Sequence, residues 1–282
     1  MRFTKMHGLG NDFVVVNGFN QELPADPEVL APRICDRRFG VGADGLVLIL
    51  PSVSVDLRMR IFNPDGSEAE MCGNAIRCVA LYAYRRGLVS GTRLQIETLA
   101  GVIRPEICFQ ADRVTVRVEM GRPRLNRAEI PMTGPAGPAI NEELDAGDRV
   151  FKITAVSMGN PHCVIFVPAL CEQEFQKYGP LLEKHPAFPA RTNVEFVTVR
   201  NTGEADVRVW ERGAGPTLAC GTGACAAVVA GVLTGRTGRT VNVRLPGGVL
   251  LIEWPDDAGS VYMSGPAEEV FDGRLLLRRT FL

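Results

Sequence analysis

Two cysteines carry the most informative chemistry in this sequence. Cys72 and Cys220 are each followed by glycine, and each opens a segment in which small and apolar residues recur at helical spacing. A thiol at the start of a helix has its thiolate stabilised by the helix dipole and by unpaired backbone N–H groups, which brings the thiol pKa toward neutrality. One such thiol can take a proton while a second gives one, so the pair predicts acid–base chemistry.

The residues that follow these cysteines add a predicted anion site. The backbone N–H groups of Gly73 and Asn74, and those of Gly221 and Thr222, would grip a substrate carboxylate. Removal of a proton α to a carboxylate puts negative charge on that group, and donors aimed from a helix end stabilise the charge. Inversion needs a proton to leave one face of the carbon and another to arrive on the opposite face. Two thiols that address one ligand therefore fit epimerisation.

Other polar residues could serve the same reaction. His162 and Glu211 could bias the protonation of the thiols, although ordinary hydrogen bonding would explain them equally well. Arg212 offers a bidentate clamp for a carboxylate, and Glu211 could bind an ammonium group. Four asparagines at predicted strand ends could recognise an amino acid or could form local turns: Asn11, Asn63, Asn160 and Asn193.

An internal repeat places the two cysteines at matching positions. Asn11 and Asn160, each after a glycine and before an apolar run, are 149 residues apart. Cys72 and Cys220 are 148 residues apart, and two further matched motifs lie between, in the same order. We therefore expect two similar halves: residues 1–119 with the first cysteine, completed by residues 266–282, and residues 120–265 with the second.

The rest of the chain is typical of strands around two helices. Alternation with period 2 marks strands with one wet face, as in residues 55–61 and 114–118, and the denser run at residues 13–16 marks a strand buried on both faces. The first helix should end with Arg85 and Arg86, before Gly87, and the second should stop near Gly235. The second helix is apolar nearly all round, so it must be buried. Strands wrapped around a central helix would bury it.

Composition narrows the class of ligand. Lysine plus arginine (31) nearly balances aspartate plus glutamate (32), so no basic surface suggests nucleic acid or an anionic membrane. No apolar run reaches the roughly 18 residues that span a bilayer, and the start of the chain lacks a signal-peptide h-region. We therefore expect a small-molecule ligand and a cytoplasmic location.

The eight cysteines are expected to be free thiols. Their density is low for a disulfide-stapled secreted domain. With three histidines and no C-x-x-C pair, we expect no metal site. Six cysteines are interpreted as packing residues: Cys35, Cys78, Cys108, Cys163, Cys171 and Cys225.

At the level of whole motifs, the sequence resembles the diaminopimelate epimerase family. The stretch from Asn63 to Arg77, NPDGSEAEMCGNAIR, is similar to the family's signature around its first catalytic cysteine. Similar stretches elsewhere span most of the chain: KMHGLGNDFVVV from Lys5, SMGNPHCV from Ser157, ERGAGPTLACGTGACAA from Glu211 and LPGG from Leu245. Gly45 departs from those members that have a substrate-contacting glutamine at this position.

The resemblance implies interconversion of LL- and meso-diaminopimelate, in lysine and peptidoglycan precursor synthesis, without pyridoxal phosphate, metal or other cofactor. It implies an α+β fold of two pseudo-symmetric halves, each a mixed β-sheet or barrel wrapped around a central helix, and a homodimer. It also implies that Cys72 and Cys220 are the two bases, that the helix starts hold the reacting carboxylate, and that His162 and Glu211 tune the thiols. The distal amino-acid end would be held by Asn11, Asn63, Asn160, Asn193, Glu211 and Arg212.

Two alternatives stay open. Proline racemase and hydroxyproline epimerase also use paired cysteines, but their substrates lack the distal amino-acid group that Arg212 and the asparagines would bind. A thiol–disulfide redox protein or a ligand-binding protein could pair Cys72 and Cys220 reversibly, although no C-x-x-C motif supports it.

Overall fold

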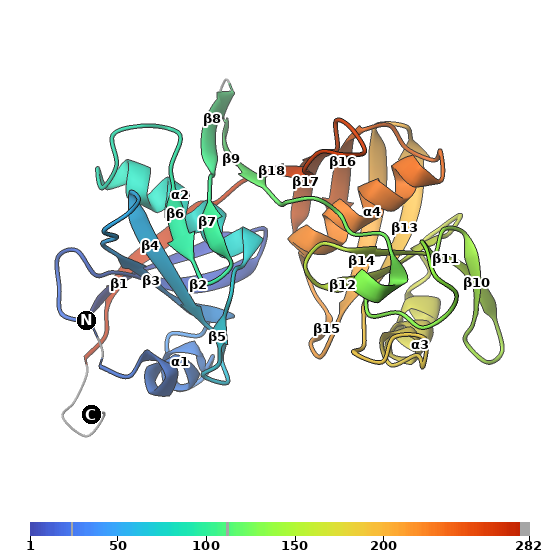
Figure 1. Cartoon of the computed structure of the whole chain (residues 1–282). Coiled ribbons are helices and arrows are strands. Elements are labelled where there is room, and N and C mark those ends of the chain that lie inside the picture. Colours follow the sequence, from blue (N-terminus) through green and yellow to red (C-terminus); the bar gives the residue numbers. More distant parts are fainter. Residues whose placement is uncertain (24, 111–112, 277–282) are drawn as a thin grey trace. The chain divides into compact units, whose positions relative to one another are not determined.

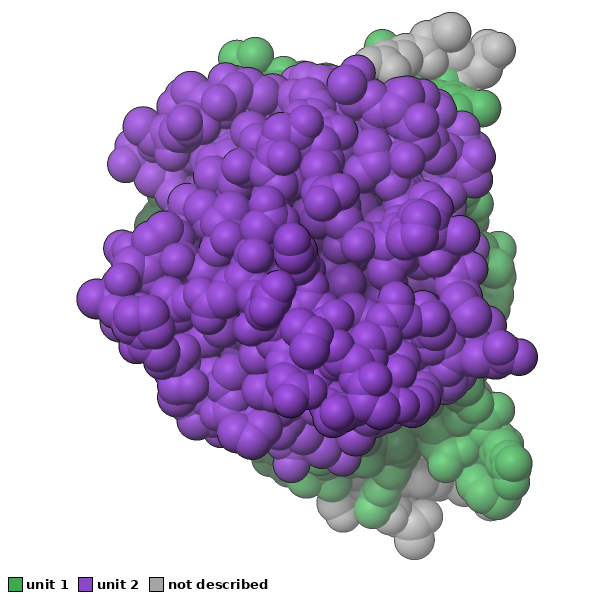
Figure 2. Space-filling model, turned by 90° about the vertical axis from the view of Figure 1, so that its right-hand side faces the viewer, with its two compact units in different colours: residues 1–118, 265–282 green, residues 119–264 purple. Residues whose placement is uncertain are grey.

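The two cysteine-led segments form the central helices of two compact units (Figure 1 and Figure 2). The computed structural model describes residues 1–23, 25–110 and 113–276. Unit 1 contains residues 1–118 together with the described part of the segment that starts at Gly265, and unit 2 contains residues 119–264. Residues 277–282, which we expected to help complete the first half, lie outside the described residues. None of the helices in the described ranges is long and apolar enough to cross a membrane.

Unit 1 is a β-sheet in the order β19-β1-β2-β3-β4-β6-β7, with helices on it. Helix α2 (Gly73–Arg85) packs against β1, β2, β4 and β19, and α1 (Pro27–Cys35) packs against β3 and β4. The short β5 pairs with β4, and β8 pairs with β9. The strand bounds are β1 Arg2–Gly8, β2 Asn11–Asn17, β3 Gly45–Leu50, β4 Leu57–Phe62, β5 Glu68–Ala69, β6 Ile96–Thr98, β7 Gly101–Ile103, β8 Glu106–Gln110, β9 Arg113–Glu119 and β19 Glu268–Arg274.

Unit 2 repeats this construction with the order β10-β11-β12-β13-β14-β16-β17-β18. Helix α4 (Gly221–Leu233) packs against β11, β12, β13, β14 and β17, so strands surround it, and α3 (Glu172–Glu183) packs against β13 and β14. A 3-10 turn, η1, covers Arg127–Glu129, and β15 pairs with β14. The strand bounds are β10 Glu142–Asp145, β11 Val150–Ser157, β12 Pro161–Phe166, β13 Asn193–Asn201, β14 Glu204–Glu211, β15 Gly215–Pro216, β16 Thr240–Leu245, β17 Gly248–Glu253 and β18 Tyr262–Gly265.

The two units share one series of strand pairings. In unit 1 the contacts β1/β2, β2/β3, β3/β4 and β4/β6 are antiparallel, parallel, antiparallel and parallel. In unit 2 the contacts β11/β12, β12/β13, β13/β14 and β14/β16 follow the same series. A helix links the members of each parallel pair, because parallel neighbours need a crossover connection. The repeat in the sequence is therefore a repeat of topology, and the predicted sheet-dominated α+β fold is confirmed.

The strands next to the central helices are buried on both faces. In β2, Val14 and Val16 belong to a core cluster with Leu30 and Ile34 of α1. Because side chains alternate along a strand, Phe13 and the residues in phase with it point to the opposite face, which α2 covers. Unit 2 has the same arrangement, with a cluster of aromatic side chains between its sheet and α3. Burial on both faces explains the continuous apolar runs in these strands.

The structure also contains two helices that the sequence did not predict. Helix α1 has Pro27 at its start and Pro32 inside, and α3 contains Pro180. Proline inside a helix removes a hydrogen bond and usually argues against the helix. The expected strand at residues 55–61 begins only at Leu57. By contrast, the predicted helix ends are close to the observed ones: α2 ends at Arg85 with Arg86 as its C-cap, and α4 ends two residues before Gly235.

Packing around α2 leads to a first prediction. Leu81 in α2 is 1% exposed, whereas Leu99 in the turn between β6 and β7 is 54% exposed. Truncation of a buried leucine leaves a cavity, so Leu81→Ala should lower the free energy of unfolding by about 2–5 kcal/mol. Leu99→Ala should change it by less than about 0.5 kcal/mol. Urea unfolding of the two variants measures both values, and equal losses would show that α2 is not packed as described.

Candidate active site

Cys72 and Cys220 are the N-cap residues of α2 and α4. Cys72 has φ −140° and ψ 121°, and Cys220 has φ −119° and ψ 109°, so both lie in the extended conformation that precedes a helix. Cys72 is partly exposed and Cys220 is 6% exposed. All eight cysteines, each within the described ranges, are free thiols, as the sequence predicted. The predicted helix starts are therefore confirmed, and each thiol lies beside the N–H groups of a first helical turn.

In unit 1, the amide of Asn11 connects Cys72 to a charged cluster. Asn11 Oδ1 accepts from Asn74 Nδ2 at 2.9 Å and from the Cys72 thiol at 3.8 Å. Its Nδ2 donates to Asp44 Oδ2 at 2.8 Å. Because a carboxylate can only accept, Asp44 fixes which end of the Asn11 amide faces the cysteine. Asn11, Asn74 and Cys72 therefore lie together, as the sequence motifs suggested.

The charges behind Asn11 balance one another. Arg37 donates to Asp12 at 2.6 Å and to Asp44 at 2.7 Å, and Lys5 donates to Asp12 and to the carbonyl oxygen of Gly42. Although burial opposes the charged form, hydrogen bonds from Arg37 and Lys5 lower the pKa of Asp12 to about 2. Asp12 is therefore ionised at neutral pH, and the cluster holds the amide group of Asn11 in place through Asp44.

Arg77 braces the first turn of α2 from inside the unit. Its side chain is fully buried and donates to Asn74 Oδ1 at 2.9 Å, to the Gly73 carbonyl at 3.1 Å and to the Pro266 carbonyl at 3.2 Å. Since Asn74 Oδ1 receives this guanidinium, its Nδ2 must point to Asn11. Gly8 leaves the necessary room, because a Cβ there would lie 2.8 Å from Arg77 Nη2. The chain segment after Gly265 thus contributes directly to the helix that Cys72 begins.

In unit 2, donors surround the sulfur of Cys220. The Gly223 N–H donates to Sγ at 3.4 Å, and Thr222 Oγ1 lies 3.5 Å from Sγ. Asn160 Nδ2 donates to Thr222 Oγ1 at 3.4 Å, which places Asn160 next to the helix start. Thr222 and Asn160, both predicted to contact the substrate, therefore form one contact group with Cys220.

A fully buried histidine–glutamate pair is hydrogen-bonded to Asn160. His162 Nδ1 lies 2.7 Å from Glu195 Oε1, and His162 Nε2 lies 2.9 Å from Asn160 Oδ1. Both side chains of the pair are 0% exposed. A Cβ at Gly223 would lie 2.8 Å from Glu195 Oε1 and 3.3 Å from Cys220 Sγ, so the carboxyl group packs directly on the first turn of α4. Sequence reasoning missed Glu195, because one acidic residue in an alternating strand resembles a solvated position.

The environment of Cys220 favours its neutral thiol. Burial, and then the carboxyl groups of Glu211 and Glu195, raise the pKa of Cys220 well above its ordinary value. Hydrogen bonds from Thr222 and the Gly223 N–H act in the opposite direction. Cys220 is therefore a neutral thiol at pH 7, and these two donors reduce the cost of its thiolate.

The predicted substrate residues Glu211, Arg212 and Asn193 lie around one turn. Asn193 Oδ1 accepts the Arg212 N–H at 2.9 Å, and Asn193 Nδ2 donates to the Pro161 carbonyl at 2.9 Å. The Arg212 side chain is exposed and donates to the Ala190 carbonyl at 3.2 Å. Glu211 Oε1 accepts the Thr217 hydroxyl at 2.6 Å. The buried amide of Asn193 thus holds the backbone from which Arg212 extends.

Asn63 is placed differently from the other asparagines. It lies in a turn where its Nδ2 donates to Ser67 Oγ at 3.0 Å and its N–H donates to the Ser67 carbonyl. Both bonds serve the local turn, in agreement with the alternative that the sequence left open for this residue. Its role as a substrate contact remains a prediction.

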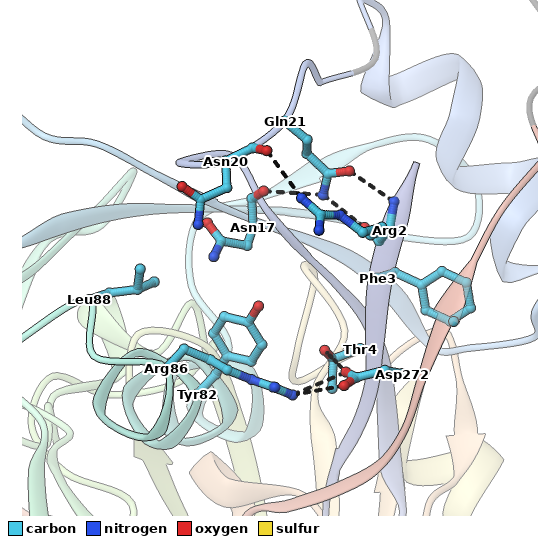
Figure 3. Close-up of a pocket in the computed structure, with 11 residues that line it drawn as sticks. Arg2, Phe3, Thr4, Asn17, Asn20, Gln21, Tyr82, Arg86, Leu88 and Asp272 are labelled. Atoms are coloured by element: carbon cyan, nitrogen blue, oxygen red, sulfur yellow. Dashed lines mark hydrogen bonds and ion pairs between the residues drawn. The ribbon is translucent and has the colours of Figure 1, made fainter.

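A pocket of about 320 Å³ lies at the other end of α2 from Cys72 (Figure 3). Tyr82 and Arg86, near the C-terminal end of the helix, line it, about 15 to 20 Å along the helix axis from the N-cap. Figure 3 shows Arg86 contacting Asp272, at 3.0 Å, and the guanidinium of Arg2 donating to the Asn20 carbonyl, at 3.2 Å. Neither cysteine lines this pocket, so it is separate from the acid–base groups.

Comparison with known sequences identifies close relatives. The family model described as diaminopimelate epimerase matches residues 3–126 and 154–270. A diaminopimelate epimerase of Desulforudis audaxviator is 77% identical over 97% of this chain and 99% of its own length. A diaminopimelate epimerase of Methanococcus maripaludis is 49% identical over 98% of this chain and 99% of its own length. The similarity therefore spans both units.

Comparison with solved structures supports the fold. A probable proline racemase from Agrobacterium radiobacter superposes with a TM-score of 0.70 at 17% identity, over 98% of this chain and 93% of that one. A phenazine biosynthesis protein of the PhzF family from Bacillus anthracis gives 0.71 at 15% identity, over 98% and 99%. At such low identity these proteins show a shared fold and no more.

The charge cluster behind Asn11 leads to a second prediction. The folded-state pKa of Asp12 is depressed to about 2, so its stabilising contribution is present above about pH 4 and is lost as pH falls toward 2. Allowing for solvent screening, Asp12→Asn should therefore lower the free energy of unfolding by about 2 kcal/mol at pH 7, and this difference should shrink as pH falls from about 4 to 3. Urea unfolding at several pH values measures it. A difference that stays constant over that range would contradict the ion-pair assignment.

Proposed function

Because this chain belongs to the diaminopimelate epimerase family, we propose that it interconverts LL- and meso-diaminopimelate by exchanging the proton on one α-carbon. The observation that carries this proposal is the pair of cysteine N-caps, one at the same topological position in each unit. Relatives from 49% to 77% identical over nearly the whole chain bear the name of this activity. Under the proposal, the two thiols supply all of the proton transfer and no cofactor takes part.

In the proposed reaction, the thiolate of one cysteine takes the α-proton, and the thiol of the other delivers its proton to the opposite face of the same carbon. The electron pair of the broken C–H bond moves into the α-carboxylate and returns when the new C–H bond forms. The N–H groups at the starts of α2 and α4 would hold that carboxylate; they belong to Gly73 and Asn74 and to Gly221 and Thr222.

Each turnover exchanges the protonation states of Cys72 and Cys220. The pair is then ready to catalyse the reverse reaction.

His162 and Glu211 are proposed to tune the thiols. The contact of His162 with Asn160 connects it to the group around Cys220, and the charge of Glu211 contributes to the raised pKa of that thiol. The charge of Glu211 favours Cys220 as the acid. Cys72 would then provide the base for the first substrate bound.

The distal amino-acid group is proposed to bind around Arg212. Its exposed guanidinium would pair with the distal carboxylate, and Glu211 would take the distal ammonium group. The bond from the Arg212 N–H to Asn193 supports this assignment, because it fixes the backbone that carries both charged residues. Asn11, Asn63 and Asn160 are proposed as further contacts to the same substrate.

We further propose a cytoplasmic enzyme that acts as a homodimer on a free amino acid and binds no nucleic acid. The nearly balanced charge and the family resemblance support this setting. Light scattering should then give a mass of about twice the 30.6 kDa of the chain. A mass of one chain would rule out the dimer without affecting the proposed chemistry.

Replacement of either proposed base should abolish inversion. Reduced protein incubated with LL-diaminopimelate in deuterium oxide should give meso product that carries one deuterium at one α-carbon. Cys72→Ala and Cys220→Ala should each lower kcat by at least about 1000-fold, because each loses one partner of the proton relay. Mass spectrometry and chiral chromatography measure the two quantities.

Matched controls lie inside the same helices. Cys78 and Cys225 are buried in α2 and α4, away from the helix starts, so Cys78→Ala and Cys225→Ala should keep kcat within about threefold. Inversion that survives in Cys72→Ala or Cys220→Ala would disprove the two-base reaction. Turnover of thiols without any amino acid would support the redox alternative.

The substrate assignment depends on Arg212. Arg212→Ala should raise KM for diaminopimelate by about 100-fold with a small effect on kcat, because one charge-assisted ion pair to the distal carboxylate is lost. Arg208→Ala is the matched control, since Arg208 pairs with Glu172 at 2.6 Å and its KM should not change. An unchanged KM for Arg212→Ala, with turnover of proline, would favour the racemase alternative.

A further inference from the structure

The pair formed by His162 of β12 and Glu195 of β13 is the most unusual polar feature of unit 2. Glu195 Oε1 contacts His162 Nδ1, whereas Glu195 Oε2 is buried and has no hydrogen-bond partner among the described residues. A full carboxylate charge with one unpaired buried oxygen would be costly. Burial correspondingly raises the pKa of the Glu195 carboxyl. The geometry therefore favours a neutral pair, with one proton shared in the bond between Oε1 and Nδ1.

The shared proton gives the neighbouring hydrogen bonds a direction. With Nδ1 facing the proton of the pair, His162 carries a hydrogen on Nε2 and donates it to Asn160 Oδ1. Asn160 must then present Nδ2 to Thr222 Oγ1, so the Thr222 hydroxyl has its own hydrogen left for Cys220 Sγ. Loss of the shared proton would let Nε2 accept instead, which would turn the amide of Asn160 and remove that donor from Cys220.

Unit 1 has no such pair at the matching positions, all of which are described. Glu195 lies opposite Val164 in the parallel pair β12/β13, and Val47 lies opposite Val15 in the matching pair β2/β3. Phe13, 149 residues before His162, is also apolar, and both Phe13 and Val47 are buried. The polar pair therefore serves the second cysteine alone.

Building on the proposed function, we infer that Glu195 is a positioning residue for the reaction. By holding a shared proton with His162, it orients the chain His162–Asn160–Thr222 so that the Thr222 hydroxyl donates to Cys220 Sγ. A donor at this sulfur stabilises the thiolate that must form once in each catalytic cycle. Glu195 acts through other residues and needs no contact with the substrate.

Three titratable groups on three strands act on this chain. Glu195 on β13 faces His162 on β12 and is influenced by Glu211 on β14, and Cys220 is influenced by Glu211 and Glu195. A negative charge on Glu195 would make the Cys220 thiolate harder to form, whereas the neutral pair makes it easier through Thr222. The two possibilities predict opposite effects when Glu195 is replaced.

Two replacements of similar length separate these possibilities. Glu195→Gln can still donate to His162 Nδ1, whereas Glu195→Met offers only a weak acceptor. The rate of Cys220 alkylation by iodoacetamide, followed over a pH series by peptide mass spectrometry, reports its thiolate without any substrate. We expect the glutamine variant to stay within about threefold of the wild type. In the methionine variant, we expect alkylation at a given pH to be about tenfold slower, the effect of one lost hydrogen bond to a charged group.

Cys72 in the same sample is the internal control, and its alkylation profile should not change, because its amide partner is oriented by Asp44. Faster alkylation of Cys220 in both variants would overturn the inference, since it would reveal a negative charge on Glu195. Wild-type rates in the methionine variant, or equal slowing in both variants, would overturn it as well. Because alkylation needs no diaminopimelate, failure here is distinguishable from failure of the proposed activity.

A measurement on the unmodified protein covers the case in which the methionine variant does not fold. The chain has three histidines, so nitrogen-15 NMR can assign the ring of His162 directly. We expect a hydrogen on Nε2 at neutral pH. A bare Nε2 with the hydrogen on Nδ1 would overturn the inference.

Discussion

The unpaired N–H groups in the first turn of a buried helix are the constraint on which each unit depends. Helix α4 is apolar on almost every side and must be enclosed by strands, yet its first N–H groups need polar partners that the helix itself cannot supply. Strands that end beside the start of the helix meet both requirements. Their apolar side chains surround the body of the helix, and polar side chains such as Asn160 lie at its first turn. Unit 1 meets the same constraint around α2 and Cys72.

Much of this organisation can be derived from the sequence, because it depends on local patterns. The cysteine N-caps follow from Cys-Gly before a helical period, and the repeated topology follows from a constant offset between motifs. Helices α1 and α3 could not be derived in this way, since Pro32 and Pro180 mask the helical pattern and only packing on the sheet stabilises them. Glu195 was missed because burial of both faces of β13 is a tertiary property, and alternation alone makes such a residue look solvated.

The two units share one topology, but the polar side chains behind their cysteines differ. Both place an asparagine beside the cysteine, but Asn11 is backed by a partly exposed cluster of permanent charges, and Asn160 by a fully buried pair. The carboxylates of the partly exposed cluster can stay charged, because water and the guanidinium of Arg37 compensate their charge. In a sealed interior an incompletely paired charge is costly, which favours a neutral pair. The difference in burial therefore sets which kind of polar group each unit can use.

The position of β19 has a consequence for the order of folding. This strand is synthesised after the whole of unit 2, yet it forms the edge of the sheet in unit 1, where it pairs with β1. Unit 2 is continuous in sequence, so its core can be completed while the growing chain still lacks the last strand of unit 1. The usual order, in which the part made first folds first, is thus reversed. Until β19 is synthesised, the edge of β1 in unit 1 remains unpaired. During this time the nascent chain is most susceptible to incorrect strand pairing.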